Sequence, residues 1–265
     1  MTTSTSPDVP ITLIGGPTVL IEYAGLRILT DPTFDEPRTY GSDVTGYEGF
    51  TLVKTHPPAL SVEAVGHVDV VLASHEHVDN LDLTGREMAA SVEHVFTTTQ
   101  VAGILPGAQA LVEWDVRTVT SSSGREVAFT AVPAHHGPEG IWQAIGPVLG
   151  FVIECPGEKT LYFSGDNSDV DVVRHVAERF PSIEIAVLNV GGPKFEEMLG
   201  DHYITFSDET ATEAAEVLAG AQIIPIHADS WQHFTQTTSS MKAVASEHGF
   251  SDRVIAMHPG QTATA

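Results

Sequence analysis

Two histidines and an aspartate stand close together in the segment Ser74-His75-Glu76-His77-Val78-Asp79. The apolar run 68–73 before this segment predicts a strand that is buried on both faces. In α/β sheets, functional sites lie beyond the carboxyl ends of such strands. Two imidazoles at positions i and i+2 and a carboxylate at i+4 offer three metal ligands within one turn. The segment therefore predicts a metal centre.

Other potential ligands also stand directly after apolar runs that predict strands. They are His135 and His136, Asp166, and His227. A single histidine after a strand is more often a surface or core residue than a ligand. Here four strand ends can present imidazoles and carboxylates to one edge of the fold, which favours a metal site over a chance collection of polar loops.

The composition limits the classes of partner. The chain has 265 residues, with 12 Lys and Arg against 35 Asp and Glu, and a formal net charge of -23. Phosphate backbones and anionic membranes attract Lys and Arg, so we expect a small-molecule substrate, with no nucleic acid and no membrane as partner. The single cysteine, Cys155, excludes an intrachain disulfide framework. Residues 1–10 lack the charged and apolar regions of a signal peptide, so we expect a cytoplasmic protein.

The elements that would position these residues fall into two similar halves. Each half begins with apolar, β-branched strands joined by tight turns and continues with alternating helices and strands. The predicted strands are 11–14, 18–23, 26–30, 68–73, 95–96, 116–120, 127–133, 148–154, 160–164, 183–188, 222–226 and 254–256. The predicted helices are 83–90, 100–105, 170–180, one that begins near Ser207, and 240–248. We expect a disordered tail over 1–10, a long ordered loop over 31–60, and one α/β domain over 11–265, built as a four-layer αβ/βα sandwich.

The order of the motifs resembles that of the metallo-β-lactamase-fold hydrolases. Within that family, the chain is similar to the branch of ascorbate-phosphate lactonase and the N-acyl-phosphatidylethanolamine phospholipase D type. The resemblance runs from about Ile11 to Gly260. It rests on the segments 15–22, 29–32, 75–79, 161–166, 224–227 and 259–260.

The resemblance implies a first metal site formed by His75, His77 and His136. His136 is preferred to His135 because that branch usually places its ligand three residues after the proline, here Pro133. Asp166 would bridge two metal ions. The second site would include Asp79 and His227.

One position departs from the family pattern. The family usually has HxHxDH, and the last residue of that motif is Asn80 here. An amide oxygen is a harder and weaker ligand than imidazole. The second site is therefore either weak or empty, or it holds a harder ion such as Mn²⁺ or Fe²⁺ through Asp79, Asp166 and His227. Zn²⁺ remains the expected ion at the three-histidine site.

The implied function is a metal-dependent hydrolase of a small ester, lactone or amide. A metal held by three histidines lowers the pKa of a bound water towards ~7, and the hydroxide so formed attacks a carbonyl or phosphoryl centre. Asp79 and Asn80 are the candidate catalytic residues, with Asp79 as a water-orienting group or general base. Asp31 is a candidate for orienting a ligand histidine. His202, His233 and Trp231 are weaker candidates for the pocket wall, and a packing role explains each equally well.

Three alternatives remain open. One is a phosphodiesterase of the same fold, although the acidic chain disfavours polyanionic substrates. Another is an iron-dependent redox enzyme, although members of that kind usually have Glu where His77 stands. A third is a metal-binding scaffold without activity.

Overall fold

Two β-sheets face each other in the computed structural model, which describes residues 6–265. The first sheet has the strand order β15-β1-β2-β3-β6-β7-β8. Its strands are β1 (Pro10–Gly15), β2 (Thr18–Tyr23), β3 (Leu26–Thr30), β6 (Val70–Ala73), β7 (His94–Thr97), β8 (Gln109–Ala110) and β15 (Thr262–Thr264). The second sheet has the order β14-β13-β12-β11-β10-β9. Its strands are β9 (Val116–Thr120), β10 (Glu126–Ala134), β11 (Val148–Glu154), β12 (Thr160–Phe163), β13 (Ile183–Asn189) and β14 (Gln222–Ile226).

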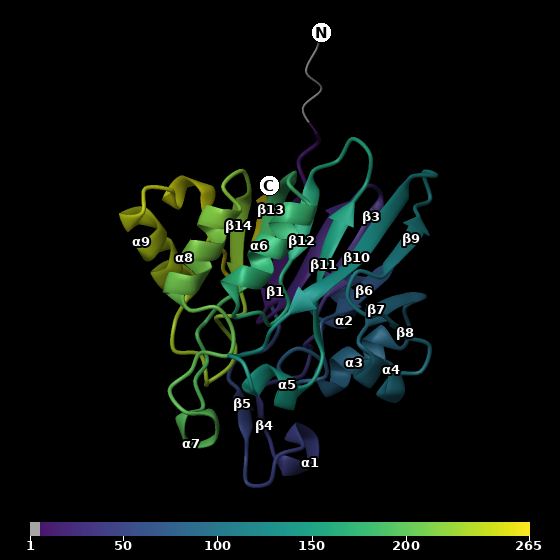
Figure 1. Cartoon of the computed structure of the whole chain (residues 1–265). Coiled ribbons are helices and arrows are strands. Elements are labelled where there is room, and N and C mark those ends of the chain that lie inside the picture. Colours follow the sequence, from purple (N-terminus) through teal and green to yellow (C-terminus); the bar gives the residue numbers. More distant parts are fainter. Residues whose placement is uncertain (1–5) are drawn as a thin grey trace.

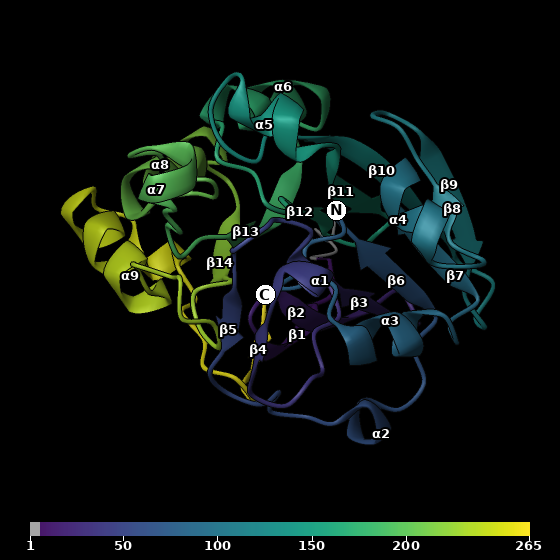
Figure 2. The ribbon, with the colours of Figure 1, turned by 90° about the horizontal axis from the view of Figure 1, so that it is seen from below.

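Helices cover the outer faces of both sheets, and further short helices lie at one end of the sandwich (Figures 1 and 2). They are α1 (Ser42–Thr45), α2 (Val62–Val65), α3 (Leu83–Ala89), α4 (Thr99–Ile104), α5 (Ile141–Ile145), α6 (Val170–Arg179), α7 (Glu196–Leu199), α8 (Asp208–Val217) and α9 (Thr238–Glu247). The helices α2, α3 and α4 pack on the first sheet, whereas α6, α8 and α9 pack on the second.

Buried side chains fill the space between the sheets and the space under each helical layer. The central core joins residues such as Ile21 and Leu72 of the first sheet to Phe129 and Phe163 of the second. Successive residues of a strand point to opposite faces of the sheet. Apolar residues on the inner face therefore fill the central core, and those on the outer face pack under the helices. The predicted four-layer αβ/βα sandwich is therefore confirmed.

The structure differs from the sequence-based expectation in the 31–60 loop and at both ends of the described chain, and it adds the short elements α2, β8, α5 and α7. The predicted loop 31–60 contains a hairpin of β4 (Arg38–Tyr40) and β5 (Leu52–Lys54). The predicted strand 254–256 is wrong, since Val254 forms only an isolated bridge with Ile223 and the last strand is β15.

The predicted tail 1–10 overlaps the fold at its end. Pro10 lies in β1, and Val9 is buried and exchanges two backbone hydrogen bonds with Ala265. The first five residues of that tail lie outside the described part of the chain. Within residues 6–265, the longest helices are too short and too polar to cross a bilayer.

Candidate metal centre

The predicted ligands lie directly after strands of both sheets. His75 and His77 follow β6 of the first sheet, while His136 follows β10, Asp166 follows β12 and His227 ends β14 on the second. These ends open towards the part of the molecule that carries α1, α5 and α7 (Figure 1). The two sheets therefore contribute side chains to one shared edge.

His75, His77 and His136 form a compact cluster. One nitrogen of each ring lies within 4.8 Å of the other two, and the ring centroids are 4.5 to 5.2 Å apart. The neighbouring His135 lies outside this cluster, because its ring stacks on Trp142 at 4.1 Å and its Nδ1 lies 2.9 Å from Asp169. The structure thus brings together the three histidines that the resemblance implied.

A hydrogen-bond relay through Ser74 fixes the tautomer of His75. The Ser74 hydroxyl donates to Oδ2 of Asp31 at 2.7 Å, so its oxygen can only accept from Nδ1 of His75, which lies 2.9 Å away. Asp31 was expected to orient a ligand histidine, and here it does so through Ser74. Burial raises the pKa of Asp31 to about 7, against the pull of donors from Ser74 and Asn80. With its proton on Nδ1, His75 presents the lone pair of Nε2 to the cluster.

The tautomer of His136 is fixed by the backbone. Its Nδ1 lies 2.6 Å from the carbonyl oxygen of Ile204, which can only accept, so Nδ1 carries the proton. The Nε2 lone pair of His136 is therefore free, and it lies 3.7 Å from Oδ2 of Asp166. Two of the three imidazoles consequently have their lone pairs set by partners outside the cluster.

The cluster is electrically suited to a cation. Burial lowers the pKa of His77 to about 4, with the nearby His136 adding to the shift, and burial together with His77 lowers the pKa of His75. These rings are neutral near pH 7 and can act as ligands. Nε2 of His75 is buried and has no hydrogen-bond partner among residues 6–265. Such an orphaned lone pair fits a metal ion, and three imidazoles are a donor set that Zn²⁺ prefers.

The two oxygens of Asp166 have different neighbours. Oδ2 faces the cluster, 3.9 Å from Nε2 of His75. Oδ1 accepts hydrogen bonds from Asn80 at 3.0 Å, from Asn189 at 2.7 Å and from Nδ1 of His227 at 3.0 Å. Burial would raise the pKa of Asp166, but the nearby His227 and its hydrogen bond hold that pKa well below its usual range, with His136 and His75 adding to the shift. One side of the carboxylate is thus turned towards the histidines, and the other is filled by N–H donors.

Asn80 lies behind the candidate centre. It was a candidate catalytic residue and a possible carbonyl ligand, but it is fully buried and is not part of the cavity wall. Its amide nitrogen donates to Asp31 and Asp166, both at 3.0 Å, because carboxylates offer only acceptors. Its amide oxygen is buried and has no hydrogen-bond partner within residues 6–265. Asn80 is therefore a positioning residue behind the centre.

Asp79 lies between two histidines. Its Oδ2 is 3.1 Å from Nε2 of His233 and 3.7 Å from Nε2 of His227. Burial alone would raise the pKa of Asp79, but the hydrogen bond from His233 and the nearby His227 hold it below its usual range. The carboxylate is therefore charged. The weak sequence signal at His233 did not identify this contact, because it joins residues 154 positions apart.

His227 occupies a strained backbone position. Its φ is 58°, in the left-handed region that residues other than glycine seldom adopt. Its backbone N–H bonds the carbonyl of Gly16, and its Nδ1 bonds Asp166. Burial would lower the pKa of His227, but Asp166 and Asp79 raise it above its ordinary value. Such strain is typical of functional positions.

A buried ion pair supports the segment beneath the histidines. Nζ of Lys54 lies 2.9 Å from Oδ2 of Asp82, and both side chains are almost fully buried. Asp82 also caps helix α3 by accepting from the backbone of Gly85. Asp82 was not singled out from the sequence, since its cation stands 28 residues away on the unpredicted hairpin. The pair thus ties β5 to the turn that carries His77 and Asp79.

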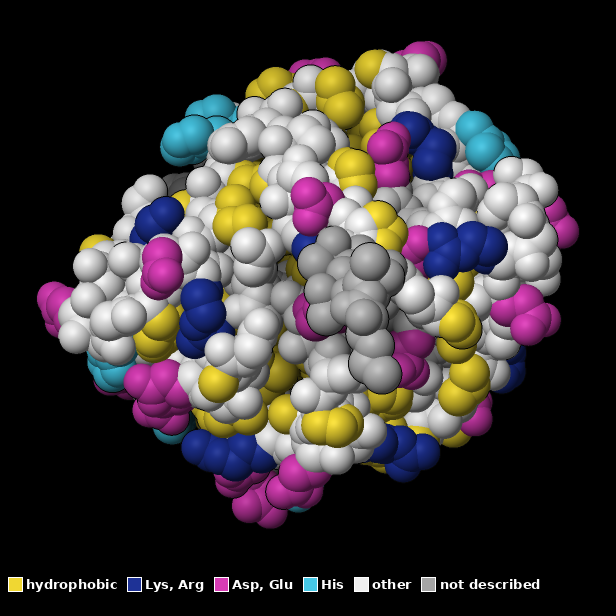
Figure 3. Space-filling view, turned by 90° about the horizontal axis from the view of Figure 1, so that it is seen from above, with side chains coloured by type: hydrophobic (Ala, Val, Ile, Leu, Met, Phe, Trp, Pro, Cys, Tyr) yellow, Lys and Arg dark blue, Asp and Glu magenta, His cyan; other side chains and the backbone are white. Residues whose placement is uncertain are grey.

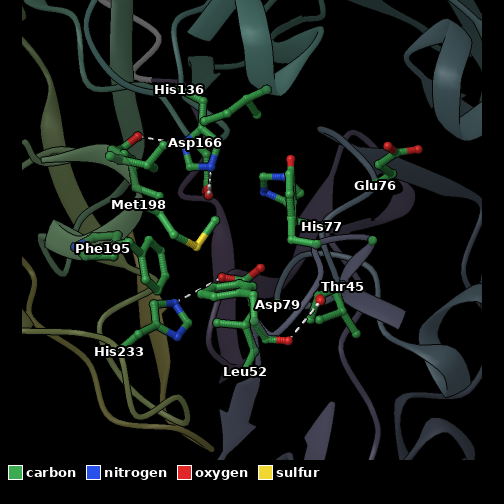
Figure 4. A pocket seen from close by; sticks show the side chains of 18 of the residues that line it. Thr45, Leu52, Glu76, His77, Asp79, His136, Asp166, Phe195, Met198 and His233 are labelled. Atoms are coloured by element: carbon green, nitrogen blue, oxygen red, sulfur yellow. Dashed lines mark hydrogen bonds and ion pairs between the residues drawn. The ribbon is translucent and has the colours of Figure 1, made fainter. Parts of the chain in front are cut away.

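A cavity of about 550 Å³ opens onto the cluster. His77, Asp79, His136, Asp166 and His233 lie in its wall, and Figure 4 shows His136, His77 and Asp79 around one space. Buried Trp231 is not part of that wall and stacks on Tyr40 instead, and His202 borders a separate, smaller cavity. The cavity has the size of a small-molecule site.

Comparison with known proteins agrees with this geometry. The model of the beta-lactamase superfamily domain matches residues 26–228, which is more than half of the chain. A UPF0173 metal-dependent hydrolase of Pelotomaculum thermopropionicum is 29% identical over 211 residues, covering 73% of this chain and 81% of that protein. N-acyl-phosphatidylethanolamine-hydrolyzing phospholipase D 1 of Caenorhabditis elegans is 21% identical, covering 82% of this chain and 62% of that protein.

A solved structure has the same fold. The isothiocyanate hydrolase from Delia radicum gut bacteria superimposes with a TM-score of 0.78 at 22% identity, covering 96% of this chain and 98% of that one. The fold, the shared strand-end edge and the matched family model agree with the resemblance seen in the sequence. The chain belongs to the beta-lactamase superfamily and is a relative of proteins named metal-dependent hydrolases.

Proposed function

We propose that His75, His77 and His136 hold one Zn²⁺ and that this metal-dependent hydrolase cleaves a small ester, lactone or amide. The observation that carries the proposal is the convergence of three imidazoles, two of them with fixed tautomers, beside a cavity of about 550 Å³ that His77 and His136 line. Mn²⁺ and Fe²⁺ are the alternative ions, because the neighbouring carboxylates also suit them.

Asp79, His233 and Asp166 have different roles around the proposed ion. When bound, the ion supplies Lewis acidity, which acidifies a water and polarises a carbonyl oxygen. Asp79 is charged and lies in the wall, so it can accept a hydrogen bond from the attacking water and orient it. His233 keeps Asp79 in place through the contact of 3.1 Å. Asp166 keeps a negative charge beside the three imidazoles.

The surroundings of Asp166 support one ion rather than two. A second ion would need Oδ1 of Asp166, which already accepts three N–H donors. Nδ1 of His227 is also used in that set and is not available to a second ion, whereas its buried Nε2 has no hydrogen-bond partner within residues 6–265 and lies 3.7 Å from Oδ2 of Asp79. We infer that the amide of Asn80 takes the place of the second ion.

The charge distribution supports a small molecule over a nucleic acid. Lys and Arg side chains are scattered among acidic ones on the face opposite the cavity and do not gather into a patch (Figure 3). With a net charge of -23, the chain has no general attraction for a polyanion.

Metal analysis and a substrate screen test the proposal. Protein purified without chelator should contain one equivalent of Zn²⁺, Mn²⁺ or Fe²⁺, and the reconstituted protein should hydrolyse an ester, a lactone or an amide. Absence of bound metal would overturn the metal site. Activity on phosphodiesters alone would favour the phosphodiesterase alternative, and metal-dependent oxygen consumption would favour the redox alternative.

A further inference from the structure

The cavity beside the histidines continues into an apolar chamber. Its walls come from three segments: Phe50 and Leu52 near β5, Phe195 and Met198 around α7, and Ile141 of α5. Phe50 and Phe195 meet edge to face at 5.0 Å, which joins the first two walls. In Figure 4, Phe195, Met198 and Leu52 surround the space next to Asp79 and His136. The apolar walls and the candidate ligands therefore belong to one continuous space.

Exposed apolar side chains gather at this chamber. Five large hydrophobic side chains are exposed among residues 6–265, and three of them, Tyr47, Ile104 and Met198, line the cavity. Exposed apolar surface that is concentrated in one place marks a binding site. The other two, Val112 and Val116, lie elsewhere and serve as a comparison.

The chamber has few positively charged side chains that could bind an anionic group. Arg86 is the only Lys or Arg among the lining residues, all of which lie in the described part of the chain. Its Nε and one terminal nitrogen donate to the carbonyl oxygens of Leu81 and Glu76. Glu76, Asp79 and Asp166 add carboxylates to the same wall. Arg86 is one cation against three carboxylates among these lining residues, so an anionic part of the substrate that lies away from the bound ion would meet net repulsion.

We propose that the substrate is an uncharged molecule with an apolar acyl or aryl part, which lies between Phe50, Phe195 and Met198 while its reacting group faces the histidines. This inference rests on the proposed hydrolase function. Phe50, Phe195 and Met198 are then specificity-determining residues. Burial of apolar substrate surface against them supplies the affinity that a charged contact would supply elsewhere.

Titration calorimetry with hydroxamic acids tests the inference without relying on turnover. Acetohydroxamate, hexanohydroxamate and octanohydroxamate share a metal-binding head group and differ only in the apolar chain. On the zinc-loaded full chain, affinity should rise by about two- to fourfold per added methylene until the chamber is filled. Suberic acid monohydroxamate, which has the same head group but ends its chain in a carboxylate, should bind at least tenfold more weakly than octanohydroxamate.

Two variants and a control locate the effect. Met198→Ser and Phe195→Ser should each reduce the ratio of octano- to acetohydroxamate affinity several-fold, because the lost apolar contact affects the long chain more than the short one. Val116→Ser removes an equally exposed aliphatic side chain outside the cavity and should leave the ratio unchanged. Equal affinity across the series, or equal affinity for suberic acid monohydroxamate and octanohydroxamate, would overturn the inference while the hydrolase function stands. A chain that binds neither Zn²⁺ nor acetohydroxamate would instead overturn the proposed function.

Discussion

The amide nitrogen of Asn80 lies 3.0 Å from Oδ1 of Asp166 and 3.0 Å from Oδ2 of Asp31. One neutral side chain thus separates two buried carboxylates that would otherwise repel each other. This bridge stands where the family pattern has a histidine. The number of ions that bind should therefore depend on the identity of residue 80.

Asn80→His should raise the metal content from one equivalent towards two, because imidazole adds a lone pair and releases Oδ1 of Asp166. Elemental analysis of the purified protein measures this directly. Asn80→Leu, of similar size, should stay at one equivalent or below and lose about 2–4 kcal/mol of unfolding free energy, since two hydrogen bonds to carboxylates disappear. Two equivalents in the unaltered chain would contradict the one-ion proposal.

His136→Ala should abolish metal binding, because it removes one of three convergent imidazoles. His135→Ala is the matched control, since it changes the adjacent histidine, which faces Asp169 and Trp142. That variant should keep one equivalent of metal. If elemental analysis finds the reverse pattern, the ligand assignment after β10 is shifted by one residue.

Ser74→Ala should weaken Zn²⁺ binding by about 10- to 100-fold. The substitution breaks the relay from Asp31 to His75, so the tautomer of His75 is no longer fixed. Competition with a chelator of known affinity measures the change. Ser123→Ala, in a turn far from the centre, should bind Zn²⁺ as the unaltered chain does, and equal affinities for both variants would show that the relay has no role.

Lys54→Met should reduce the free energy of unfolding by about 3–5 kcal/mol, because it leaves the buried charge of Asp82 without its cation. Lys159→Met removes an exposed pair with Asp8 and should cost at most about 1 kcal/mol. Denaturant titration of both variants compares them. Similar losses would mean that the Lys54 pair contributes no more than a surface contact.

Features that depend on residues close together in the sequence could be predicted from it. Strand periodicity and the polar residues directly after each strand indicated the sandwich and a shared metal-binding edge, whereas the set of His75, His77 and His136 was implied by the resemblance to the family. The hairpin of β4 and β5 was missed because strands of three residues show no measurable period.

The direction of the Asn80 amide and the partner of Asp79 could not be predicted either. The first depends on Asp31 and Asp166, 49 and 86 positions away, and the second depends on His233. Such contacts are set by how the sheets pack. Local spacing contains no information about them.

The distribution of donors over the two sheets links assembly of the fold to loading of the ion. His75 and His77 come from one sheet and His136 comes from the other, so neither half of the chain alone holds a complete set. A nascent chain can therefore acquire high affinity only after the second sheet has closed on the first. Bound metal would act as a cross-link between the halves, and its loss should loosen that edge of the sandwich before the core unfolds.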